Sequence, residues 1–368
     1  MVDAKQLGSR LAALCGLTLL AVAPQARAEV PKDELIVRIF DIGQGSCVLV
    51  ECPGDAPILN DCGKMGSGGD IKKAAKTIRE RIADSRATYP TPLRVVVSHP
   101  HIDHYSVITA KSSGISPDDM RAFYYAGPFD SFSDAAQTWI KTLATRVDGA
   151  SASPAACSAT ARVTCLLPNE HALDTPRLSC GLARVDLLTA SAFSYNNGLA
   201  SGRKAEEGSS PNGESAVLRI TYGGVSIVLP GDAEGVTQAY AAENAAALGA
   251  PLARTTVLLL PHHGSNLYGS NNDAWVAATT PRLVVASANI GGNYGHPNCD
   301  VLERFDAVTA PDQAMESLAK PLSITCGLSK KKPKEPRTLQ HRFLFTEWNG
   351  DITLRVSAAG AMTVSCEK

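Results

Sequence analysis

The chain has 368 residues, 44% of them hydrophobic, and its 35 basic and 36 acidic side chains give a net charge of −1. A chain of this length can bury an ample core as one large domain. A nearly neutral surface has no general attraction for nucleic acid, so the composition argues against a protein that coats DNA through charge alone.

The first segment predicts export. Lys5 and Arg10 form a basic region, residues 11–23 are a short apolar stretch, and residues 26–28 (Ala-Arg-Ala) have the form of a cleavage site. Residues 1–28 are therefore expected to be a secretory signal peptide, and the mature chain is expected to be periplasmic or secreted. The alternative is a membrane anchor, but the apolar stretch is shorter than the roughly 18 residues that a spanning helix needs, so no stable membrane insertion is expected.

The cysteines agree with an oxidising compartment. All but one of the ten cysteines follow residue 28, a number that predicts several disulfides and at least one free thiol. Cys157, Cys165 and Cys180 lie together in an Ala/Ser-rich stretch, which favours a local crosslink there. The sequence contains no C-x-x-C pair, so a cysteine zinc site is not expected.

Apolar alternation and turn residues predict the secondary structure in chain order. The first part predicts a hairpin, a third strand, a helix and a buried strand, at residues 35–40 with 47–51, 57–60, 71–86 and 93–97. After a stretch at about 110–212 the pattern predicts a second hairpin and two short buried strands, at residues 216–222 with 225–229, 257–260 and 283–287. Two sets of strands with helices between them suggest two packed sheets with helices outside.

Four potential metal ligands follow the predicted strand at 93–97 in the order H-x-H-x-D-H; they are His99, His101, Asp103 and His104. Histidines two apart at the end of a strand can both reach one cation, and the Asp and His that follow can reach a second cation nearby. The alternative interpretation is a chance cluster of histidines in a surface loop.

Later strand ends provide further ligands. The strand at 225–229 stops at a glycine turn and Asp232, whose carboxylate is suited to bridging two cations. The strand at 257–260 stops at two adjacent imidazoles, His262 and His263. Each feature alone has an ordinary structural explanation, because Gly-Asp is a common turn and His-His a common polar loop. Together with the H-x-H-x-D-H motif they predict a metal centre.

These segments resemble the metallo-β-lactamase superfamily, and within it the extracytoplasmic hydrolase domain of the DNA-uptake protein ComEC and its stand-alone relatives. The matching segments are residues 40–45, 58–63, 98–104, 223–227, 231–234, 261–265, 294–297 and 349–353. The resemblance implies an α/β fold, the metallo-β-lactamase-like four-layer αββα sandwich. It also implies a single hydrolase domain over residues 29–368, with a Cys-containing insertion at about 110–212 and without the membrane channel.

The resemblance implies a metal-dependent hydrolase with a defined ligand set. His99 and His101 are expected to hold one cation, and Asp103, His104 and His262 a second, with Asp232 bridging the two. His262 is preferred because it is the first imidazole after its strand. Imidazole and carboxylate ligands suit one or two Zn ions, and also Mn or Fe.

Other residues are expected to assist catalysis. His263 is expected to contact the substrate, and His296, in a Gly/Asn-rich loop, to donate a proton to the leaving group. The alternative for His296 is a loop histidine that is capped by neighbouring backbone. Asp103 is expected to act in catalysis as well as in metal binding, and Asp61, at a strand end, to orient a metal-bound histidine through its other ring nitrogen.

The sequence departs from the family at three points. Ser46 stands where the family usually has an acidic residue, and Cys62 where it usually has glycine. A third metal histidine, common between the motif and the bridging Asp, has no convincing counterpart, because His171 is expected at the surface. We therefore expect one of the two metal positions to be weak, filled by water or empty.

The predicted activity is hydrolysis by a metal-bound hydroxide. The favoured substrate is a phosphodiester, either a small molecule or a nucleic acid, and the sequence indicates no particular protein partner. A β-lactamase or lactonase-type hydrolase of amide or ester bonds is the alternative enzyme, and a binding protein that kept the fold is a third possibility. The missing third histidine argues against the former, and the complete H-x-H-x-D-H motif against the latter.

Overall fold

The structure is a computed structural model. It describes residues 33–145, 163–166, 178–193, 211–249, 251–290, 292, 294–308, 322–327, 334–340 and 343–368. The expected signal peptide at residues 1–28, and His171, lie outside the described residues. Within the described part of the chain, every helix is too short or too polar to cross a lipid bilayer.

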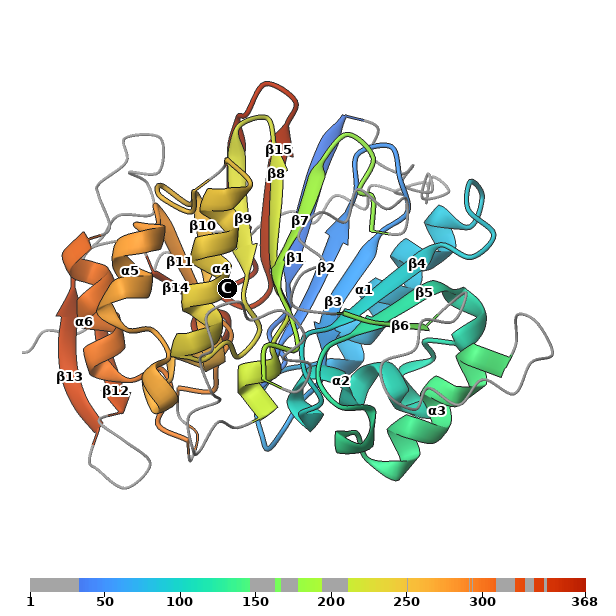
Figure 1. The fold of residues 1–368 in the computed structure, drawn as a ribbon, viewed down its shortest axis with the longest axis horizontal. Helices are drawn as coiled ribbons and strands as arrows, with labels where there is room; N and C mark the ends of the chain where they lie inside the picture. The colour runs from blue at the N-terminus through green and yellow to red at the C-terminus, as the bar shows by residue number, and fades with distance from the viewer. Residues whose placement is uncertain are drawn as a thin grey trace, which may run out of the picture.

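Two large sheets form the centre of the molecule (Figure 1). The first has eight strands in the order β16 (Met362–Cys366), β15 (Ile352–Ser357), β1 (Glu34–Ile39), β2 (Cys47–Glu51), β3 (Ile58–Cys62), β4 (Leu93–Val97), β5 (Met120–Tyr125) and β6 (Val163–Cys165). The second has six strands in the order β14 (Phe343–Phe345), β11 (Leu283–Ala286), β10 (Val257–Leu259), β9 (Val225–Leu229), β8 (Val217–Tyr222) and β7 (Arg184–Thr189). A separate hairpin pairs β12 (Leu322–Gly327) with β13 (Lys334–Leu339).

Helices cover the outer face of each sheet (Figure 1). The first sheet is covered by α1 (Ile71–Ser85), α2 (Ile102–Thr109) and α3 (Asp134–Thr145). The second sheet is covered by α4 (Gly235–Ala247), α5 (Asp273–Thr279) and α6 (Cys299–Val308). A single helical turn, α7 (Thr346–Asn349), links β14 to β15.

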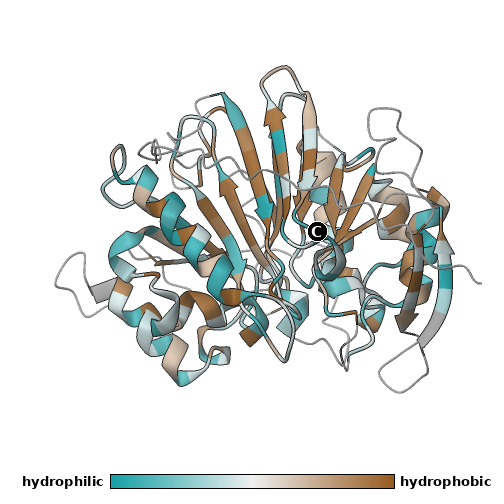
Figure 2. Ribbon diagram, turned by 180° about the vertical axis from the view of Figure 1, so that it is seen from behind, coloured by the Kyte–Doolittle hydropathy of each residue, from teal (hydrophilic) through white to brown (hydrophobic). Residues whose placement is uncertain are grey.

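Successive side chains of a strand point to opposite sides of the sheet. The strands are buried on both faces because each sheet packs against the other sheet on one side and against helices on the other. In β2, Val50 lies in the core between the two sheets, whereas Leu49 lies in the core beneath α1 to α3. In β9, Ile227 lies in the central core, whereas Val228 lies beneath the helices of the second sheet. The hydrophobic strands dominate the middle of the molecule in Figure 2. Helix, sheet, sheet and helix therefore form four layers, which confirms the expected α/β αββα sandwich.

Most elements expected from local patterns are confirmed to within one or two residues. The expected strand at 93–97 is β4, and the expected helix at 71–86 is α1, which begins where the Asp70 side chain accepts a hydrogen bond from Lys73 N. The stretch at 110–212 contributes β5 and β6 to the first sheet and β7 to the second. Its described parts are therefore built into the sandwich.

Three disulfides join described residues, namely Cys47–Cys62, Cys52–Cys180 and Cys299–Cys326. Cys165 is also disulfide-bonded, and Cys366 is a free thiol, so the expectation of several disulfides and a remaining thiol is confirmed. The expected local crosslink is wrong for Cys180, whose partner lies 128 residues away. The reason is that Leu182 N donates to the Pro53 carbonyl, which holds this segment against the end of β2.

Candidate metal centre

The expected ligands lie at the carboxyl ends of parallel strands in both sheets. β3 and β4 are parallel in the first sheet, and β9, β10 and β11 are parallel in the second. The loops after parallel strands meet at one edge of a sheet, which is where α/β folds usually bind ligands. The packing of the two sheets brings both edges together, so that loops from distant parts of the chain form one centre.

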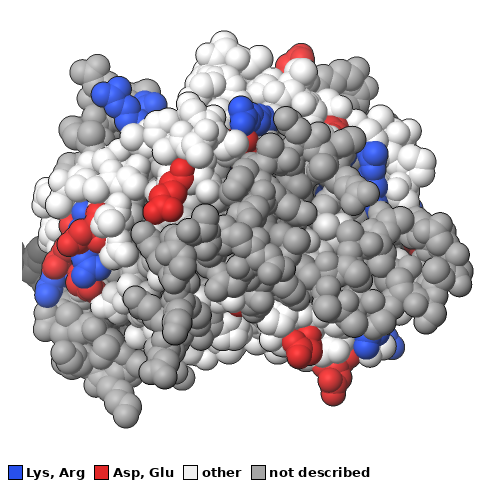
Figure 3. All heavy atoms as spheres, in the orientation of Figure 1, with Lys and Arg blue, Asp and Glu red and all other residues white. Residues whose placement is uncertain are grey.

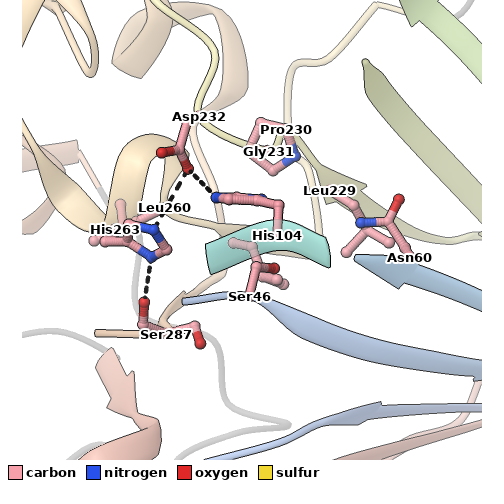
Figure 4. Close-up of a pocket in the computed structure, with 11 residues that line it drawn as sticks. Ser46, Asn60, His104, Leu229, Pro230, Gly231, Asp232, Leu260, His263 and Ser287 are labelled. Carbon is pink, nitrogen blue, oxygen red and sulfur yellow. Dashed lines mark hydrogen bonds and ion pairs between the residues drawn. The ribbon is translucent and has the colours of Figure 1, made fainter. Parts of the chain in front are cut away.

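Two overlapping groups of ligand atoms form this centre. One comprises His99, His104 and Asp232, the other Asp103, His104 and His263, and the atoms within each group lie within 4.8 Å of one another. His104 Nε2 is 3.1 Å from Asp232 Oδ1, and His263 Nε2 is 3.6 Å from the same oxygen. Figure 4 shows Asp232 next to these two rings. Imidazole and carboxylate donors this close suit a divalent transition-metal cation.

Hydrogen bonds hold the outer ring nitrogens of two histidines. His104 Nδ1 donates to Asp61 Oδ2 at 2.9 Å, and His263 Nδ1 donates to the Ser287 carbonyl oxygen at 2.7 Å. In the neutral rings these bonds select the tautomer with a lone pair on Nε2. Both Nε2 atoms are buried and have no aligned hydrogen-bond partner among the described residues. The residues therefore fit a bound cation beside Asp232.

Several contacts hold Asp61 in position beside His104. Its backbone is left-handed, with φ 55°, a conformation that Asp adopts more readily than most residues. Its carboxylate accepts hydrogen bonds from Ser98 N at 2.7 Å and from Ser98 Oγ at 2.9 Å. The Cys47–Cys62 disulfide joins β2 to β3 directly beside it. Asp61 thus lies where the sequence places it, next to a candidate metal-binding histidine.

The turn after β10 determines which of two adjacent histidines faces the centre. His262 and His263 both have left-handed backbones, with φ of 52° and 54°, which costs about 1–3 kcal/mol for each such residue and is common at functional sites. His263 Nε2 lies 3.4 Å from Asp103 Oδ2. His262 Nε2 instead lies 3.2 Å from Asn212 Nδ2 and 3.9 Å from Asp232 Oδ2. The structure thus places His263, rather than His262, in the group with Asp103.

The other expected residues surround the same centre. His99 Nε2 is 3.9 Å from Asp232 Oδ2 and 3.1 Å from His101 Nδ1. His101, His262 and His296 line an adjoining cavity of about 250 Å³. The ring centroids of His262 and His296 are 5.6 Å apart. This cavity lies directly beside the ligand groups and offers space for a substrate.

Three polar residues that contact the candidate ligands and their neighbour His262 were not expected from the sequence. Ser98 Oγ lies 3.1 Å from His99 Nδ1, and Ser215 Oγ lies 3.4 Å from the same nitrogen. Ser215 Oγ also accepts a hydrogen bond from Asp232 N at 3.0 Å, and Asn212 contacts the ring of His262 as described above. Ser98 directly precedes the H-x-H-x-D-H motif, which is a usable signal, whereas the sequence around Ser215 and Asn212 has none.

Burial and neighbouring charges shift the pKa values of the centre in opposite directions. Burial lowers the pKa of His99 well below its ordinary value, and His104 lowers it further. Burial also opposes a charge on His104, but Asp232 and Asp61 raise the pKa of His104 well above its ordinary value. Burial likewise opposes ionisation of Asp232, but His104 and His263 hold the pKa of Asp232 well below its ordinary value. The ionised carboxylates therefore attract positive charge, which a cation can provide in place of histidine protons.

Proteins similar to this chain are found among solved structures. No family model and no curated protein matches the chain. Among solved structures, it is similar to a variant of the β-hydroxylase CmlA, with 13% identity and a TM-score of 0.34 over 71% of this chain and 47% of CmlA. It is also similar to unliganded yeast PDE1, with 11% identity and a TM-score of 0.38 over 76% of this chain and 85% of PDE1.

A further similar structure is the metallo-β-lactamase SMB-1 bound to 2-mercaptoethanesulfonate. The identity is 14% and the TM-score 0.28, over 64% of this chain and 83% of SMB-1. The chain spans less than half the length of CmlA. At this level of similarity, the interpretation of the metal centre rests on the geometry of this chain itself.

Proposed function

We propose that the chain is an exported metal-dependent hydrolase of the metallo-β-lactamase superfamily that cleaves phosphodiesters. One observation carries this proposal: the two rings of His104 and His263 are held from outside by Asp61 and the Ser287 carbonyl, and their inner nitrogens approach the same oxygen of Asp232. Metal-binding histidines typically have this arrangement, because an outer acceptor fixes the ring and its tautomer.

Two cation positions share Asp232 in this proposal. The first would be held by His99 and His101 and the second by Asp103, His104 and His263. His263 thereby takes the ligand position that the sequence suggests for His262. Asp232 can serve both positions because Oδ1 faces His104 and His263, whereas Oδ2 faces His99 and His262. This donor set suits one or two zinc ions, with manganese or iron as alternatives.

A bound cation would lower the pKa of coordinated water toward about 7 and polarise a substrate oxygen. The chain's own residues orient the reactants. Although burial opposes ionisation of Asp103, His263 and His104 keep its pKa below the ordinary value, so its carboxylate can accept a hydrogen bond from the attacking water. His296 lines the adjoining cavity, where its ring can donate a proton to the leaving oxygen.

The cavity and the disulfides support the choice of substrate and compartment. His101, His262 and His296 line the cavity, and imidazole N–H groups can donate to phosphate oxygens. The resemblance to ComEC-type hydrolase domains also favours a phosphodiester over an amide or ester. Three disulfides among the described residues favour an oxidising location, such as the periplasm or the exterior of the cell.

A substrate panel with and without metal tests the proposed function. The purified chain would be assayed with a chromogenic phosphodiester, a single-stranded oligonucleotide and a β-lactam, before and after chelation. We expect phosphodiester turnover that stops on chelation and returns when zinc or manganese is added. Cleavage of the β-lactam without phosphodiester turnover would replace the proposed substrate, and activity in protein that elemental analysis shows to be metal-free would refute the metal centre.

Two matched variants in the same experiment separate the adjacent histidines. His263→Ala should lower the metal content and the turnover together, because it removes a ligand atom. His262→Ala should keep the metal of the second position, because this ring faces Asn212 and the substrate cavity. Equal metal loss in both variants would contradict the assignment.

A further inference from the structure

A second cavity, of about 650 Å³, lies between α1 and the segment formed by α2 and the turn after it. Three basic side chains line it, those of Lys64, Lys72 and Arg79, together with serine hydroxyls and small apolar side chains. None of the described residues that line this groove is acidic. The groove therefore concentrates positive charge within a concave surface, although the whole chain is nearly neutral.

The basic residues of α1 differ in whether a carboxylate compensates their charge. Lys73, Lys76 and Arg81 each form an ion pair with a carboxylate. Lys72 and Arg79, which are seven residues apart, both line the groove. In the described part of the chain neither has a carboxylate within ion-pair distance. Positive charge on this helix is thus compensated except where it faces the groove.

Lys64, the third basic residue of the groove, donates to a backbone carbonyl, as Arg79 does. Lys64 Nζ donates to the Gly68 carbonyl, and Arg79 Nη1 donates to the Ser113 carbonyl. Carbonyl acceptors position these two groups without neutralising their charge. Uncompensated charge in a cleft with low-dielectric walls attracts anions.

The groove adjoins the metal centre through one loop and one helix. In the loop after β3, Met65 lines the cavity at the metal centre, whereas its neighbours Lys64 and Gly66 line the groove. In α2, Asp103 belongs to the metal centre and Ser106 lines the groove, and residues three apart on a helix have Cβ atoms about 5–6 Å apart. Ser106 Oγ accepts a hydrogen bond from Lys64 N at 2.9 Å, which ties the loop to the helix. The groove and the cavity at the metal centre therefore lie on two sides of this loop, and a ligand that occupies both would pass over Met65.

We propose that this groove binds a phosphate of the substrate other than the one that is hydrolysed. The proposal rests on the proposed function and narrows its substrate to a phosphodiester that carries at least two phosphates, such as a short single strand. Ammonium, guanidinium and hydroxyl donors match phosphate oxygens, and the apolar side chains of Ile71 and Val107 can pack against the uncharged part of such a ligand.

A long duplex fits the described part of the surface less well. Binding along a duplex needs a continuous basic surface. Among the described residues on the face drawn in Figure 3, charged side chains of both signs are scattered among uncharged ones. Three cations in one groove are enough for one or two phosphates beyond the metal centre.

The test compares two double variants of the same helix in the full chain. Lys72→Gln/Arg79→Gln removes two charges from the groove, and the control Lys76→Gln/Arg81→Gln removes two charges that do not line the groove and are paired with carboxylates. We expect the groove variant to raise KM for a single-stranded oligonucleotide about tenfold, which corresponds to about 1.4 kcal/mol, with little change in kcat, because the lost contacts lie away from the hydrolysed phosphate. KM for bis(p-nitrophenyl) phosphate, which has one phosphate, should stay unchanged in both variants.

Salt dependence gives a second readout. The slope of log affinity against log salt concentration should fall by roughly 0.7 for each phosphate contact that is lost from a single strand. The control variant should keep the slope of the original chain. Equal oligonucleotide KM values and equal slopes in the two variants would overturn the proposal.

Calorimetric titration with pyrophosphate separates the groove from the proposed function. Weaker binding in the groove variant than in the control supports an anion site even if no phosphodiester is hydrolysed, and equal binding overturns it. Weaker binding of pyrophosphate with an unchanged KM for the oligonucleotide also overturns the proposal, because the groove would then hold a separate phosphate ligand. If the double variant does not fold, Lys72→Gln and Lys76→Gln provide the same comparison, since both side chains are exposed on α1.

Discussion

Exchange of Asp61 for asparagine tests most directly how His104 is oriented. The Asp61 carboxylate accepts hydrogen bonds from Ser98 N, Ser98 Oγ and His104 Nδ1, at 2.7, 2.9 and 2.9 Å. Asparagine has nearly the same shape and tolerates the left-handed backbone at this position, so the backbone should stay in place. Its carbonyl oxygen can still accept from Ser98 N, but its amide group then donates toward His104. The ring must accept this bond at Nδ1 and carry its proton on Nε2, where the cation is expected to bind.

The expected effect is large because the position is closed to solvent. Loss of the outer partner of a metal-bound histidine typically lowers metal affinity or activity about 10–100-fold, which corresponds to about 1.4–2.7 kcal/mol. Asp61 is 0% exposed, so water cannot replace the lost acceptor, and we expect a value in the upper part of this range. The free energy of unfolding should also fall by about 1–3 kcal/mol if a buried donor is left unsatisfied.

Metal affinity of Asp61→Asn can be measured by competition with a chromogenic chelator, together with metal content by elemental analysis. Asp186→Asn is a matched control, because Asp186 is also buried and pairs with Arg219 Nη2 at 2.6 Å, but it lines neither cavity. The control should lose stability and keep its metal affinity. Unchanged affinity in Asp61→Asn, or an equal loss in both variants, would refute the reasoning.

Two further variants test the packing around the centre and the fold beneath it. Gly231→Ala should lower the free energy of unfolding in urea by about 1–3 kcal/mol and reduce the metal content, because φ is 54° and an added Cβ would lie 2.6 Å from Ser98 Cβ; original stability would contradict the contact. Asp55 lies 3.0 Å from Arg94 Nη2, and although burial opposes ionisation, hydrogen bonds from Ser179 and Arg94 keep the pKa of Asp55 below 3.8. Since the folded pKa is the lower one, this stabilisation is present above the unfolded pKa and disappears as the pH falls through the folded pKa. The thermal unfolding temperature of Asp55→Asn should therefore be lower than that of the original chain at pH 7, and the two temperatures should converge in acid. A difference in unfolding temperature that is the same at every pH would contradict the role of the charge.

The strands, and the position of polar residues at their ends, could be predicted because both depend on local patterns. The apolar run of β4 identifies a strand that is buried on both faces, and the polar residues that follow it must lie at the edge of the sheet. The same reasoning holds for β9 and Asp232. The positions of these two strand ends along the sequence do not depend on contacts between distant parts of the chain.

The sequence favours His262 as the ligand, whereas the structure groups His263 with Asp103 and His104. His262 and His263 are the same residue type, and the choice depends on two successive left-handed backbones, a conformation that is uncommon for residues other than glycine. The strands β5 to β7 were missed because they are separated by polar stretches, and their place depends on pairing with strands far away in the chain. Long-range pairing also explains why the partner of Cys180 could not be found from spacing.

The candidate ligand residues come from both sheets, since His104 follows β4 in the first, whereas Asp232 and His263 follow β9 and β10 in the second. A cation held among them would act as a crosslink between the two halves of the sandwich, and neither half has the full ligand set alone. By thermodynamic linkage, its binding free energy would add to the free energy of unfolding, by about 2.7 kcal/mol when free cation exceeds Kd about 100-fold. Metal supply would then govern both the fraction of active centres and the lifetime of the folded chain against proteolysis.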